Sequence, residues 1–134
     1  MVVLVDSSVF CAYANVRDVH HENAKRLIGE IVSRKYGSGL TTDYIFDETV
    51  SVVLRKSGKN NAINIGRFLL NSEIQLAKVD ELLFQKAWHL FQNSDNLGFT
   101  DCTSVAFVQT FGIKNIATFD KGFRGLKNIE VLGV

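Results

Sequence analysis

The sequence contains no proline and only two cysteines among its 134 residues. Without proline, the ends of helices and strands have to be marked by glycine, asparagine and aspartate. The two cysteines, Cys11 and Cys102, are too few for the disulfide framework that stabilises many small secreted domains. The apolar run Val2 to Val5 is interrupted by Asp6 before the hydrophobic region of a signal peptide could form. We therefore expect the protein to be cytoplasmic.

Long apolar runs and strong net charge are absent as well. No stretch approaches the roughly 20 apolar residues of a membrane-spanning helix, so we expect no membrane association. A net charge of +1 at neutral pH neither favours nor excludes nucleic acid as a partner. The three histidines, His20, His21 and His89, do not stand at metal-ligand spacing from a cysteine or a carboxylate, which argues against a zinc site.

The residues that are present suffice for one hydrophobic core. Of the 134 residues, 46% are hydrophobic, and 10 are phenylalanine. This amount of apolar material fills one core of ordinary size and leaves none for a second. No Gly/Ser-rich linker, repeat or low-complexity segment divides the chain. We therefore expect a single domain that spans residues 1–134.

Short apolar runs rich in β-branched residues alternate with longer segments of helical periodicity. Val2 to Val5 is too short for a helix and has no polar position, which is typical of a strand buried on both faces. Further strands are predicted at Leu40–Thr42, Ile74–Val79, Ile116–Phe119 and Ile129–Leu132. This alternation predicts an α/β fold with three α/β/α layers around a central, mainly parallel sheet.

Helices are predicted between these runs, and polar residues mark their first turns. The helical segments are SSVFCAYAN, residues 18–35, a segment that ends near Lys56, residues 60–71, ELLFQKAWHLFQN and DCTSVAFVQTF. The predicted capping residues are Ser7 or Ser8, Thr42 or Asp43, Asp80 and Thr100. Gly112 is expected to end the last of these helices.

Two aspartates directly follow strand-like runs. Asp6 stands at the carboxyl end of Val2 to Val5, and Asp120 follows the run that ends at Phe119. Open α/β sheets bind ligands in the crevice outside the carboxyl ends of their strands. Each aspartate alone is equally compatible with a helix cap or a turn. Their shared position makes both of them candidates for one site.

Two further acidic residues are predicted on helices. At 3.6 residues per turn, Glu48 falls beside Ile45 at the margin of an apolar face, whereas Asp47 falls on the polar side. A carboxylate near a core needs a partner, and an ion pair with Arg55 is the alternative to a role in a site. Asp101 stands in a first helical turn, where the helix dipole also favours a carboxylate.

Four carboxylates that converge at one edge of a sheet are suitable ligands for a hard divalent cation. Without a cation they repel one another, which raises the pKa of at least one of them. Mg²⁺ and Mn²⁺ prefer oxygen ligands, keep several waters and promote the attack of water on a phosphodiester. The chain has 15 basic residues against the other ten of its 14 acidic ones, so the acidic site would lie in a mildly basic body. Such a charge distribution suits a polyanionic substrate.

The four acidic residues stand in segments that resemble the motifs of the PIN-domain nucleases. VDSSVF resembles the first Asp motif of this family, DYIFDETV the mid-chain Glu motif, FTDCTSVAF the third acidic motif and IATFDKGF the last. The motifs occur in the family's order and cover nearly the whole chain. Among single-domain members of this size, the chain is most similar to VapC-type toxin ribonucleases and their archaeal relatives.

The resemblance implies which residues form the site. By this resemblance, the catalytic residues and metal ligands are Asp6, Glu48, Asp101 and Asp120. Small hydroxyl residues that support the acids are implied at Ser8, Ser104 and Thr118. The implied activity is hydrolysis of single-stranded RNA by a ribonuclease that depends on Mg²⁺ or Mn²⁺. A cognate antitoxin of the VapBC type and a homodimer are also implied, and the amphipathic helices of residues 43–71 offer apolar surface for pairing.

Basic residues that follow the last acidic motif are candidates for substrate contacts. Lys121, Arg124 and Lys127 lie close behind Asp120 in the sequence. They can bind phosphates beside the site, although such a run is also typical of a solvated surface. The residues themselves do not distinguish RNA from DNA.

Aromatic residues near the acids are candidates for stacking on unpaired bases. They can equally belong to the core, and the residues concerned are Phe10, Tyr13, Phe99 and Phe123. Trp88 stands between Phe84 and Phe91 at helical spacing and is expected to be a packing residue.

Two other functions also place acidic residues at strand ends. A receiver-type or phosphotransfer domain binds Mg²⁺, but the chain reads DSS after Val5 rather than the paired D-x-D of that class. A PIN-like module that binds RNA or protein without cleavage is the second alternative. The presence of all four acids argues against it, because a scaffold has no evident use for so much negative charge in one crevice.

Overall fold

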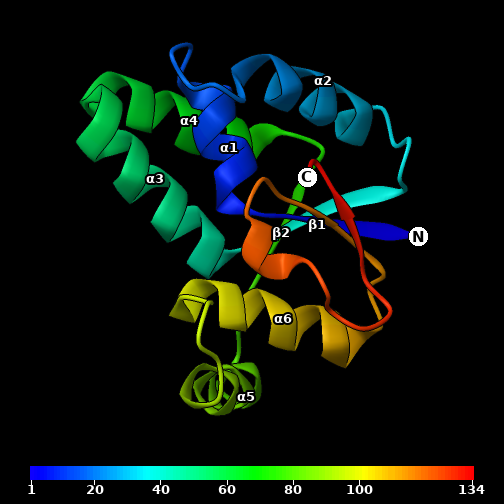
Figure 1. Cartoon of the computed structure of the whole chain (residues 1–134). Coiled ribbons are helices and arrows are strands. Elements are labelled where there is room, and N and C mark those ends of the chain that lie inside the picture. The colour runs from blue at the N-terminus through cyan, green and yellow to red at the C-terminus, as the bar shows by residue number, and fades with distance from the viewer.

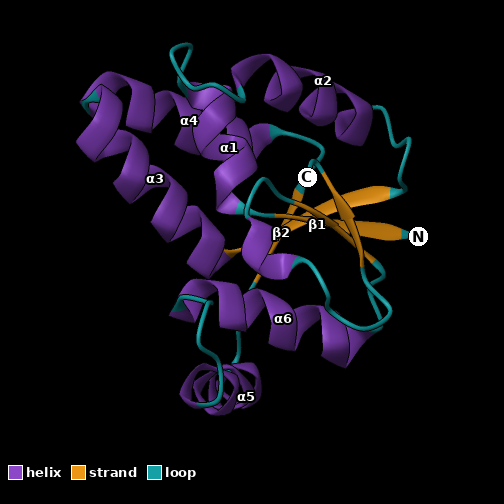
Figure 2. Cartoon of the chain, viewed as in Figure 1, coloured by secondary structure: helices purple, strands orange, loops and turns teal.

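The computed structural model describes all residues from 1 to 134 and has a central sheet between helical layers (Figures 1 and 2). Its strands are β1 (Val2–Val5), β2 (Ser38–Thr42), β3 (Gln75–Ala77), β4 (Asn115–Ala117) and β5 (Glu130–Leu132). The five strands lie in the order β3-β2-β1-β4-β5, and every neighbouring pair is parallel. The predicted α/β/α fold with a parallel sheet is therefore confirmed.

Six α-helices and one 3₁₀-helix connect the strands. They are α1 (Ser7–Ala14), α2 (His21–Val32), α3 (Asp43–Ser57), α4 (Lys59–Asn71), α5 (Glu81–Gln92), α6 (Phe99–Phe111) and the 3₁₀-helix η1 (Lys121–Phe123). Figure 1 shows α1 and α2 on one side of the sheet and α6 on the other, with α5 packed on the outside of α6. None of these helices is long and apolar enough to span a membrane.

The central strand β1 is buried because it lies between β2 and β4 under both helical layers. Val3, Leu4 and Val5 have no exposed surface, in agreement with their apolar character. A strand with polar positions could not occupy this place, because both of its faces contact the core. The main core cluster contains 25 buried residues, including Phe10 and Phe123. The base-stacking role considered for these two phenylalanines is therefore wrong, since neither ring reaches the surface.

The parallel register brings the carboxyl ends of neighbouring strands to one edge of the sheet. Val5 of β1 lies opposite Ala117 of β4. One residue further, the amide of Asp6 donates a hydrogen bond of 2.9 Å to the carbonyl of Ala117. This bond fixes Asp6 beside the segment that leaves β4.

Three of the predicted helix ends are confirmed. The side chain of Thr42 accepts from the amide of Ile45 at the start of α3, and Asp80 accepts from the amide of Leu83 at the start of α5. Gly112 ends α6 in the left-handed conformation, with a φ of 65° that glycine adopts without strain.

Two predicted caps are wrong. Asp6, and not Ser7 or Ser8, caps α1, because its own carboxylate accepts from the amide of Ser8. Helix α6 begins at Phe99 after Gly98, and not after Thr100. The carboxylate of Asp101 accepts a hydrogen bond of 3.2 Å from the backbone amide of Gly98, as an acidic residue at the third helical position does in a capping box.

Several element boundaries also differ from the prediction. Strand β2 begins two residues earlier than predicted, at Ser38, and β3 spans only Gln75–Ala77 of the predicted Ile74–Val79. The strand expected at Ile116–Phe119 ends at Ala117, because its neighbour β5 ends opposite this residue at Leu132. The amide of Thr118 still donates a hydrogen bond of 2.8 Å to the carbonyl of Leu132, and Phe119 is the first residue without a bond to the neighbouring strand. The helix expected at residues 18–35 is shorter and spans only His21–Val32, and Arg34 just beyond it has a φ of 67° that no helix accommodates.

Candidate metal centre

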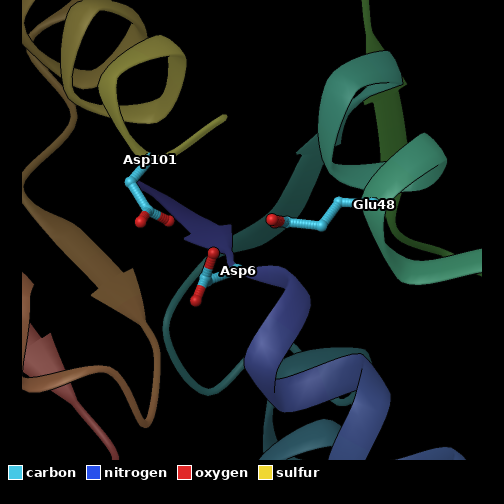
Figure 3. Close-up of side chains that lie close together, drawn as sticks. All are labelled: Asp6, Glu48 and Asp101. Carbon is cyan, nitrogen blue, oxygen red and sulfur yellow. The ribbon is translucent and has the colours of Figure 1, made fainter. Parts of the chain in front are cut away.

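Three carboxylates from distant parts of the chain meet at the carboxyl edge of the sheet. Asp6 follows β1, Glu48 lies in the second turn of α3, and Asp101 lies in the first turn of α6. One oxygen of each lies within 4.8 Å of the others. In Figure 3 the three side chains point toward one another. This spacing allows a single cation to contact all three.

Asp6 is the most buried of the three acids, with an exposed fraction of 2%. Its Oδ2 accepts hydrogen bonds of 2.8 Å from the hydroxyls of Ser8 and Thr118. Its Oδ1 is buried without any hydrogen-bond partner. Burial raises the pKa of this carboxyl, against the opposing effect of the hydrogen bonds. An unpaired buried carboxylate oxygen is costly, and a cation at this point would remove the cost.

The two hydroxyls that contact Asp6 belong to a larger hydrogen-bond network. Their oxygens lie 3.1 Å apart. The amide of Phe119 donates to the hydroxyl of Ser8 at 3.0 Å, and the amide of Asp120 donates to that of Thr118 at 3.0 Å. The segment after β4 therefore holds both hydroxyls in place, and they in turn fix the orientation of the Asp6 carboxylate.

Glu48 is half-buried and faces the cluster, as its helical position predicts. Its Oε2 accepts a hydrogen bond of 2.7 Å from the hydroxyl of Ser7. Burial is the main cause that raises its pKa, and the charge of Asp6 adds to the effect. The alternative ion pair with Arg55 does not form, because none of the four ion pairs of the structure includes Glu48. The neighbouring Asp47 is exposed, as predicted.

Ser7 is a site residue that the sequence did not single out. The sequence shows two adjacent serines after Asp6, and only Ser8 was considered as a support for the acids. In the first turn of α1 their side chains point in different directions, so that Ser8 contacts Asp6 and Ser7 contacts Glu48. The two adjacent serines thereby orient two different carboxylates.

Asp101 has a strongly raised pKa. Burial, followed by the charges of Asp6, Glu48 and Asp120, raises its pKa to about 7. The amide of Gly98 donates to its Oδ2 and partly opposes this rise. The metal-free site therefore carries a carboxyl that keeps its proton to a much higher pH than an ordinary aspartate does.

Asp120 does not belong to the group of three. Its Oδ1 accepts a hydrogen bond of 2.8 Å from the amide of Gly122, which caps the 3₁₀-helix η1. It nevertheless lies near enough for its charge to raise the pKa values of Glu48 and Asp101. The structure thus brings three of the four predicted ligands together, and direct ligation by Asp120 stays a prediction.

The other predicted site residues fall into two groups. Ser104 lies one turn after Asp101 on α6 and is fully buried, and its hydroxyl has no hydrogen-bond partner. Lys121, Arg124 and Lys127 are exposed on the segment that follows Asp120.

The aromatic residues of α5 pack on one another near the surface. Trp88 was predicted to be a packing residue and does contact neighbouring rings, but the exposed fractions of Trp88, Phe84 and Phe91 are 51%, 43% and 39%. Their rings pack on one another or on Phe99, at the start of α6, instead of on the core. The helical spacing correctly places these rings on one face, but that face is turned to the surface.

The largest cavity of the surface lies away from the acids. It has a volume of about 740 Å³ and is lined by residues at the amino ends of the strands, including Val2, Asn115 and Glu130. Size alone would place a ligand there. We assign the functional site to the acidic edge, because it combines converging ligands, raised pKa values and an unpaired buried oxygen.

The donor set fits a hard divalent cation. All three converging side chains offer carboxylate oxygens, and no histidine or cysteine belongs to the group. Oxygen-only sites are typical of Mg²⁺, Mn²⁺ and Ca²⁺, whereas zinc sites contain nitrogen or sulfur. The mutual repulsion that raises the pKa values of these acids is relieved when a cation lies between them.

The sequence has curated relatives along nearly its whole length. It is 28% identical to the 23S rRNA-specific endonuclease VapC20 of Mycobacterium tuberculosis over 131 aligned residues. The aligned region covers 96% of this chain and 97% of the relative. It is 24% identical over 126 residues to the VapC ribonuclease of Archaeoglobus fulgidus, which covers 92% of this chain and 80% of that one.

Solved structures of VapC proteins have the same fold as this chain. The crystal structure of M. tuberculosis VapC20, described as a Sarcin-Ricin loop cleaving toxin, matches with a TM-score of 0.80 at 27% identity, over 89% of this chain and 90% of that chain. VapBC2 of Rickettsia felis, bound to a DNA fragment from its promoter, matches with a TM-score of 0.68. At 14% identity over 98% of this chain and 97% of that chain, the second match shows the fold alone.

The family assignment rests on the chain as a whole. The PIN domain matches residues 3–129, a range that includes all four acidic motifs. The receiver-type alternative is therefore wrong. Fold, acidic edge and sequence agree, and this chain belongs to the PIN-domain family.

Proposed function

We propose that this protein is a divalent-metal-dependent ribonuclease that hydrolyses single-stranded RNA and serves as the toxin of a VapBC-type pair. The observation that carries the proposal is the convergence of Asp6, Glu48 and Asp101 around an unpaired buried oxygen of Asp6 in a PIN-domain chain. The relatives named as an endonuclease and a ribonuclease support the same reaction class.

In this proposal, the three clustered carboxylates hold Mg²⁺ or Mn²⁺. Such an ion supplies a water of lowered pKa and neutralises negative charge on the phosphate. Asp6 contributes its free Oδ1, while Ser8 and Thr118 hold its other oxygen. Ser7 aims the carboxylate of Glu48 in the same way. These hydroxyls orient the ligands and stay out of the reaction itself.

We assign a more distant role to Asp120 and Ser104. Asp120 adds negative charge at the edge of the cluster and can accept a hydrogen bond from a water there, while it continues to cap η1. The buried hydroxyl of Ser104 lacks a partner and supports the site from the helix that carries Asp101. Both assignments follow from position and await a test by substitution.

The RNA in this proposal lies over the acidic edge. Lys121, Arg124 and Lys127 are exposed on the segment directly after Asp120, where they can bind phosphates on either side of the cleaved bond. The relative VapC20 is a 23S rRNA-specific endonuclease by name, which favours RNA over DNA as the substrate of this chain. We also propose that the protein acts in the cytoplasm, where such a substrate is found.

Two protein partners complete the proposal. A cognate antitoxin would block the acidic edge, for example with an arginine that pairs with the carboxylates. A second copy would form a homodimer. The exposed aromatic stripe of Phe84, Trp88 and Phe91 on α5 is uncharged, so two copies can bury it against each other without opposing like charges. Light scattering of the wild type and of Trp88→Glu tests this pairing.

The central test is Mg²⁺- or Mn²⁺-dependent cleavage of a mixed pool of single-stranded RNAs. Asp101→Asn removes one ligand and should abolish cleavage while the circular dichroism spectrum stays unchanged. Asp95→Asn removes an exposed acid from the loop before the same helix and should cleave at the wild-type rate. Cleavage by Asp101→Asn at the wild-type rate would contradict the proposal. RNA binding by the wild type without any cleavage would instead favour the PIN-like binding module.

A further inference from the structure

The largest cavity of the surface lies at the edge of the sheet opposite the acids and has two neighbouring lobes. The first lobe has a volume of about 740 Å³ and the second of about 700 Å³. They share residues 112–114, just after α6, and residues 128–129, just before β5. Pockets for small ligands typically measure about 300–1,000 Å³, so each lobe is large enough to hold one.

One wall of the first lobe is an exposed aromatic ring. Phe111, the last residue of α6, has an exposed fraction of 61% and is the one aromatic residue that lines either lobe. Its ring packs on the buried ring of Phe107, and the two ring centroids lie 4.7 Å apart. A ring that is held by a buried neighbour and stays largely exposed is suited to stack on an unpaired base.

Hydrogen-bonding side chains line the same lobe as this ring. Asn115 at the start of β4 and Glu130 at the start of β5 are paired neighbours in the sheet, and both line the first lobe. Asn128 lines both lobes and has a φ of 63°, a conformation that asparagine adopts more readily than most residues. Side-chain amides and carboxylates form hydrogen bonds with the edges of bases. The lobe therefore offers both a stacking surface and partners for a base edge.

Two lysines supply unpaired positive charge to the cavity. Lys114 lines both lobes and Lys127 lines the second. The carbonyl of Lys114 accepts a hydrogen bond of 2.7 Å from the amide of Glu130, which fixes the starts of β4 and β5 beside each other. None of these three side chains takes part in an ion pair of the structure. Two lysines against one carboxylate suit the phosphate of a nucleotide.

We propose that this cavity binds one unpaired nucleotide of the RNA substrate, with its base on Phe111 and its phosphate beside Lys114 and Lys127. This inference rests on the proposed function and extends it, because it gives the RNA a second contact remote from the cleaved bond. Aromatic rings, hydrogen-bonding side chains and cations are the groups with which proteins hold single-stranded RNA.

The connection between β4 and β5 leads from the acidic edge to the cavity. Because these strands are parallel, the chain after Asp120 has to return to the amino edge of the sheet. Lys121, Arg124 and Lys127 are exposed along this connection at intervals of three residues, and Lys127 is the one that lines the cavity. Figure 1 shows the connection running toward the end of α6. An RNA strand that follows these cations passes from the carboxylates to the cavity.

The length of α6 sets the number of nucleotides between the two contacts. Asp101 lies in its first turn and Gly112 ends it, which corresponds to about 17 Å along the helix. A stacked strand advances roughly 3.4 Å per nucleotide, so about five nucleotides bridge this distance. An RNA of four nucleotides is therefore too short to occupy both contacts, whereas an RNA of 12 nucleotides can do so.

Other occupants fit the cavity less well. A second copy that docks through the same face would bring the lysines of both copies together, and like charges across an interface oppose association. Double-stranded RNA offers phosphates, but its bases are paired and stacked on one another and cannot reach Phe111. A free nucleotide lacks the further phosphates that Lys121 and Arg124 can bind. An unpaired strand matches the ring, the hydrogen-bonding groups and the cations together.

The first test measures RNA binding by the full chain in an excess of chelator, which prevents metal-dependent cleavage. Fluorescence anisotropy compares single-stranded RNAs of four and 12 nucleotides, and we expect the longer RNA to bind at least about tenfold more tightly. Phe111→Ala should lose this advantage, whereas Phe111→Tyr should keep it because the ring remains. Leu70→Ala removes a side chain that is 65% exposed and lies outside the cavity, so the advantage should stay unchanged.

The second test measures the charge of the cavity through the salt dependence of binding. Each phosphate contact to a single strand contributes about 0.7 to the slope of log Kd against log salt. The double variant with Lys114→Gln and Lys127→Gln should therefore lower this slope by about 1.4 for the longer RNA. The control variant with Lys25→Gln and Arg26→Gln removes two exposed cations from α2, on the other side of the sheet, and should leave the slope unchanged.

Cleavage of the longer RNA with Mn²⁺ separates the cavity from the metal centre. Phe111→Ala should raise KM about tenfold and leave kcat unchanged, because the ring binds the RNA far from the reacting bond. If the wild type binds the RNA through Phe111 but does not cleave it, the proposed function is wrong and the cavity assignment stands. If it cleaves both RNAs with the same KM, the cavity assignment is wrong and the nuclease stands.

Three further results would overturn the proposal. The first is that the longer RNA does not bind at about 1 mM in chelator. The second is that Phe111→Ala loses no more affinity than Leu70→Ala, which would mean that the ring does not contact RNA. The third is that adenosine 5′-monophosphate shifts the amide resonance of Gly112 with the same Kd as the longer RNA, which would identify the occupant as a free nucleotide.

Discussion

The acidic edge and the apolar groove between helices α3 and α4 are built in opposite ways. At the edge, three segments far apart in the sequence bring like charges together and partly bury them, so the pKa values of Asp6, Glu48 and Asp101 all rise. The groove is lined by the apolar residues Phe46, Val50, Leu54, Ile63 and Leu70 and by the cations Lys59 and Arg67, among others. In it, two consecutive helices joined at Gly58 expose aliphatic side chains and keep their cations apart along a rim. A bound cation would reduce the repulsion between the carboxylates at the edge. An apolar surface would cover the exposed aliphatic side chains of the groove.

This difference predicts which substitutions should lower activity and which should leave activity and stability unchanged. Removing charge from the edge eases repulsion within the fold while it removes a ligand, so activity falls without loss of stability. Adding charge to the groove alters only an exposed surface, so neither the fold nor the reaction should change. The following predictions test this separation.

The largest effect should come from Glu48 and its neighbour Asp47. Glu48→Gln should lower the rate of RNA cleavage at least about a hundredfold, because loss of a ligand costs more than loss of a residue that supports one. Asp47→Asn changes an exposed acid on the same helix turn and should leave the rate unchanged. Single-turnover cleavage of one RNA by both variants measures the contrast. A similar loss in both would mean that helix α3, and not the Glu48 carboxylate, is required.

Ser7 should have the next largest effect. Its hydroxyl is the hydrogen-bond donor to Glu48, so Ser7→Ala should slow cleavage about 10- to 100-fold at a low metal concentration. Higher concentrations of Mn²⁺ should restore part of the rate, because the defect lies in the position of a ligand. A titration of activity against Mn²⁺ measures both effects. If the rate of Ser7→Ala equals that of the wild type at every concentration, the hydrogen bond has no role in the site.

Addition of Mn²⁺ should stabilise the wild-type fold. At a metal concentration about a hundredfold above Kd, binding contributes about 2.7 kcal/mol, which raises the Tm by about 5–10 °C in a domain of this size. The double variant with Asp6→Asn and Asp101→Asn should show no rise. Differential scanning calorimetry with and without Mn²⁺ makes the comparison. A rise that survives both substitutions would place the ion elsewhere.

The free energy of unfolding of the metal-free protein should decrease as the pH rises, because of Asp101. Its carboxyl has a pKa of about 7 in the folded chain and 3.8 as the reference value. Below about pH 4 the group is protonated in both states and carries no penalty. Between about pH 4 and 7 the unfolded chain loses this proton first, so the penalty on the fold grows, and above pH 7 it is constant. The wild type should therefore lose stability relative to Asp101→Asn across this range.

Urea denaturation in the presence of a chelator at several pH values measures this difference. Asp6 and Glu48 also have raised pKa values, so they act in the same direction in both proteins. The comparison with Asp101→Asn isolates the contribution of Asp101. A stability difference between the two proteins that does not change with pH would contradict the electrostatic account of the site.

The smallest effect should come from Gly66 in the groove. A Cβ at this position would be in ordinary contact with Phe46 and Val50, and no atom lies closer than 3.6 Å. Gly66→Ala should therefore stabilise the fold by about 0.5–1 kcal/mol, since alanine restricts the unfolded chain and favours helix. Urea denaturation measures the gain, and RNA cleavage should stay at the wild-type rate. A loss of stability would mean that α4 packs on α3 more tightly than this spacing allows.

Much of the architecture could be predicted from local pattern. The run Val2 to Val5 indicated the central strand because it is entirely apolar, rich in β-branched residues and too short for a helix before Asp6. The inward orientation of Glu48 followed from helical periodicity, and so did the exposure of Asp47. The caps at Thr42 and Asp80 were confirmed because an N-cap depends on only three or four consecutive residues.

Features that depend on the packing of distant segments were predicted less well. The hydrogen bond of Ser7 to Glu48 joins residues that are 41 positions apart, and nothing local to Ser7 signals it. The spacing of Phe84, Trp88 and Phe91 predicted a common face but could not tell whether that face covers the core or the surface. The placement of Asp120 outside the group of three depends on the turn that follows β4, which was predicted as part of a longer strand.

The sequence alone determined the order of strands and helices, the apolar central strand and the acidic residues at the ends of elements. These follow from periodicity and from the chemistry of single residues, which act over a few positions. The tertiary structure decided which acids share a site and which oxygen of Asp6 stays free. It also decided that α3 and α4 leave a basic-rimmed groove between them. The distances between the acids, the free oxygen and the groove all depend on how segments far apart in the sequence pack against one another. Local sequence does not determine that packing.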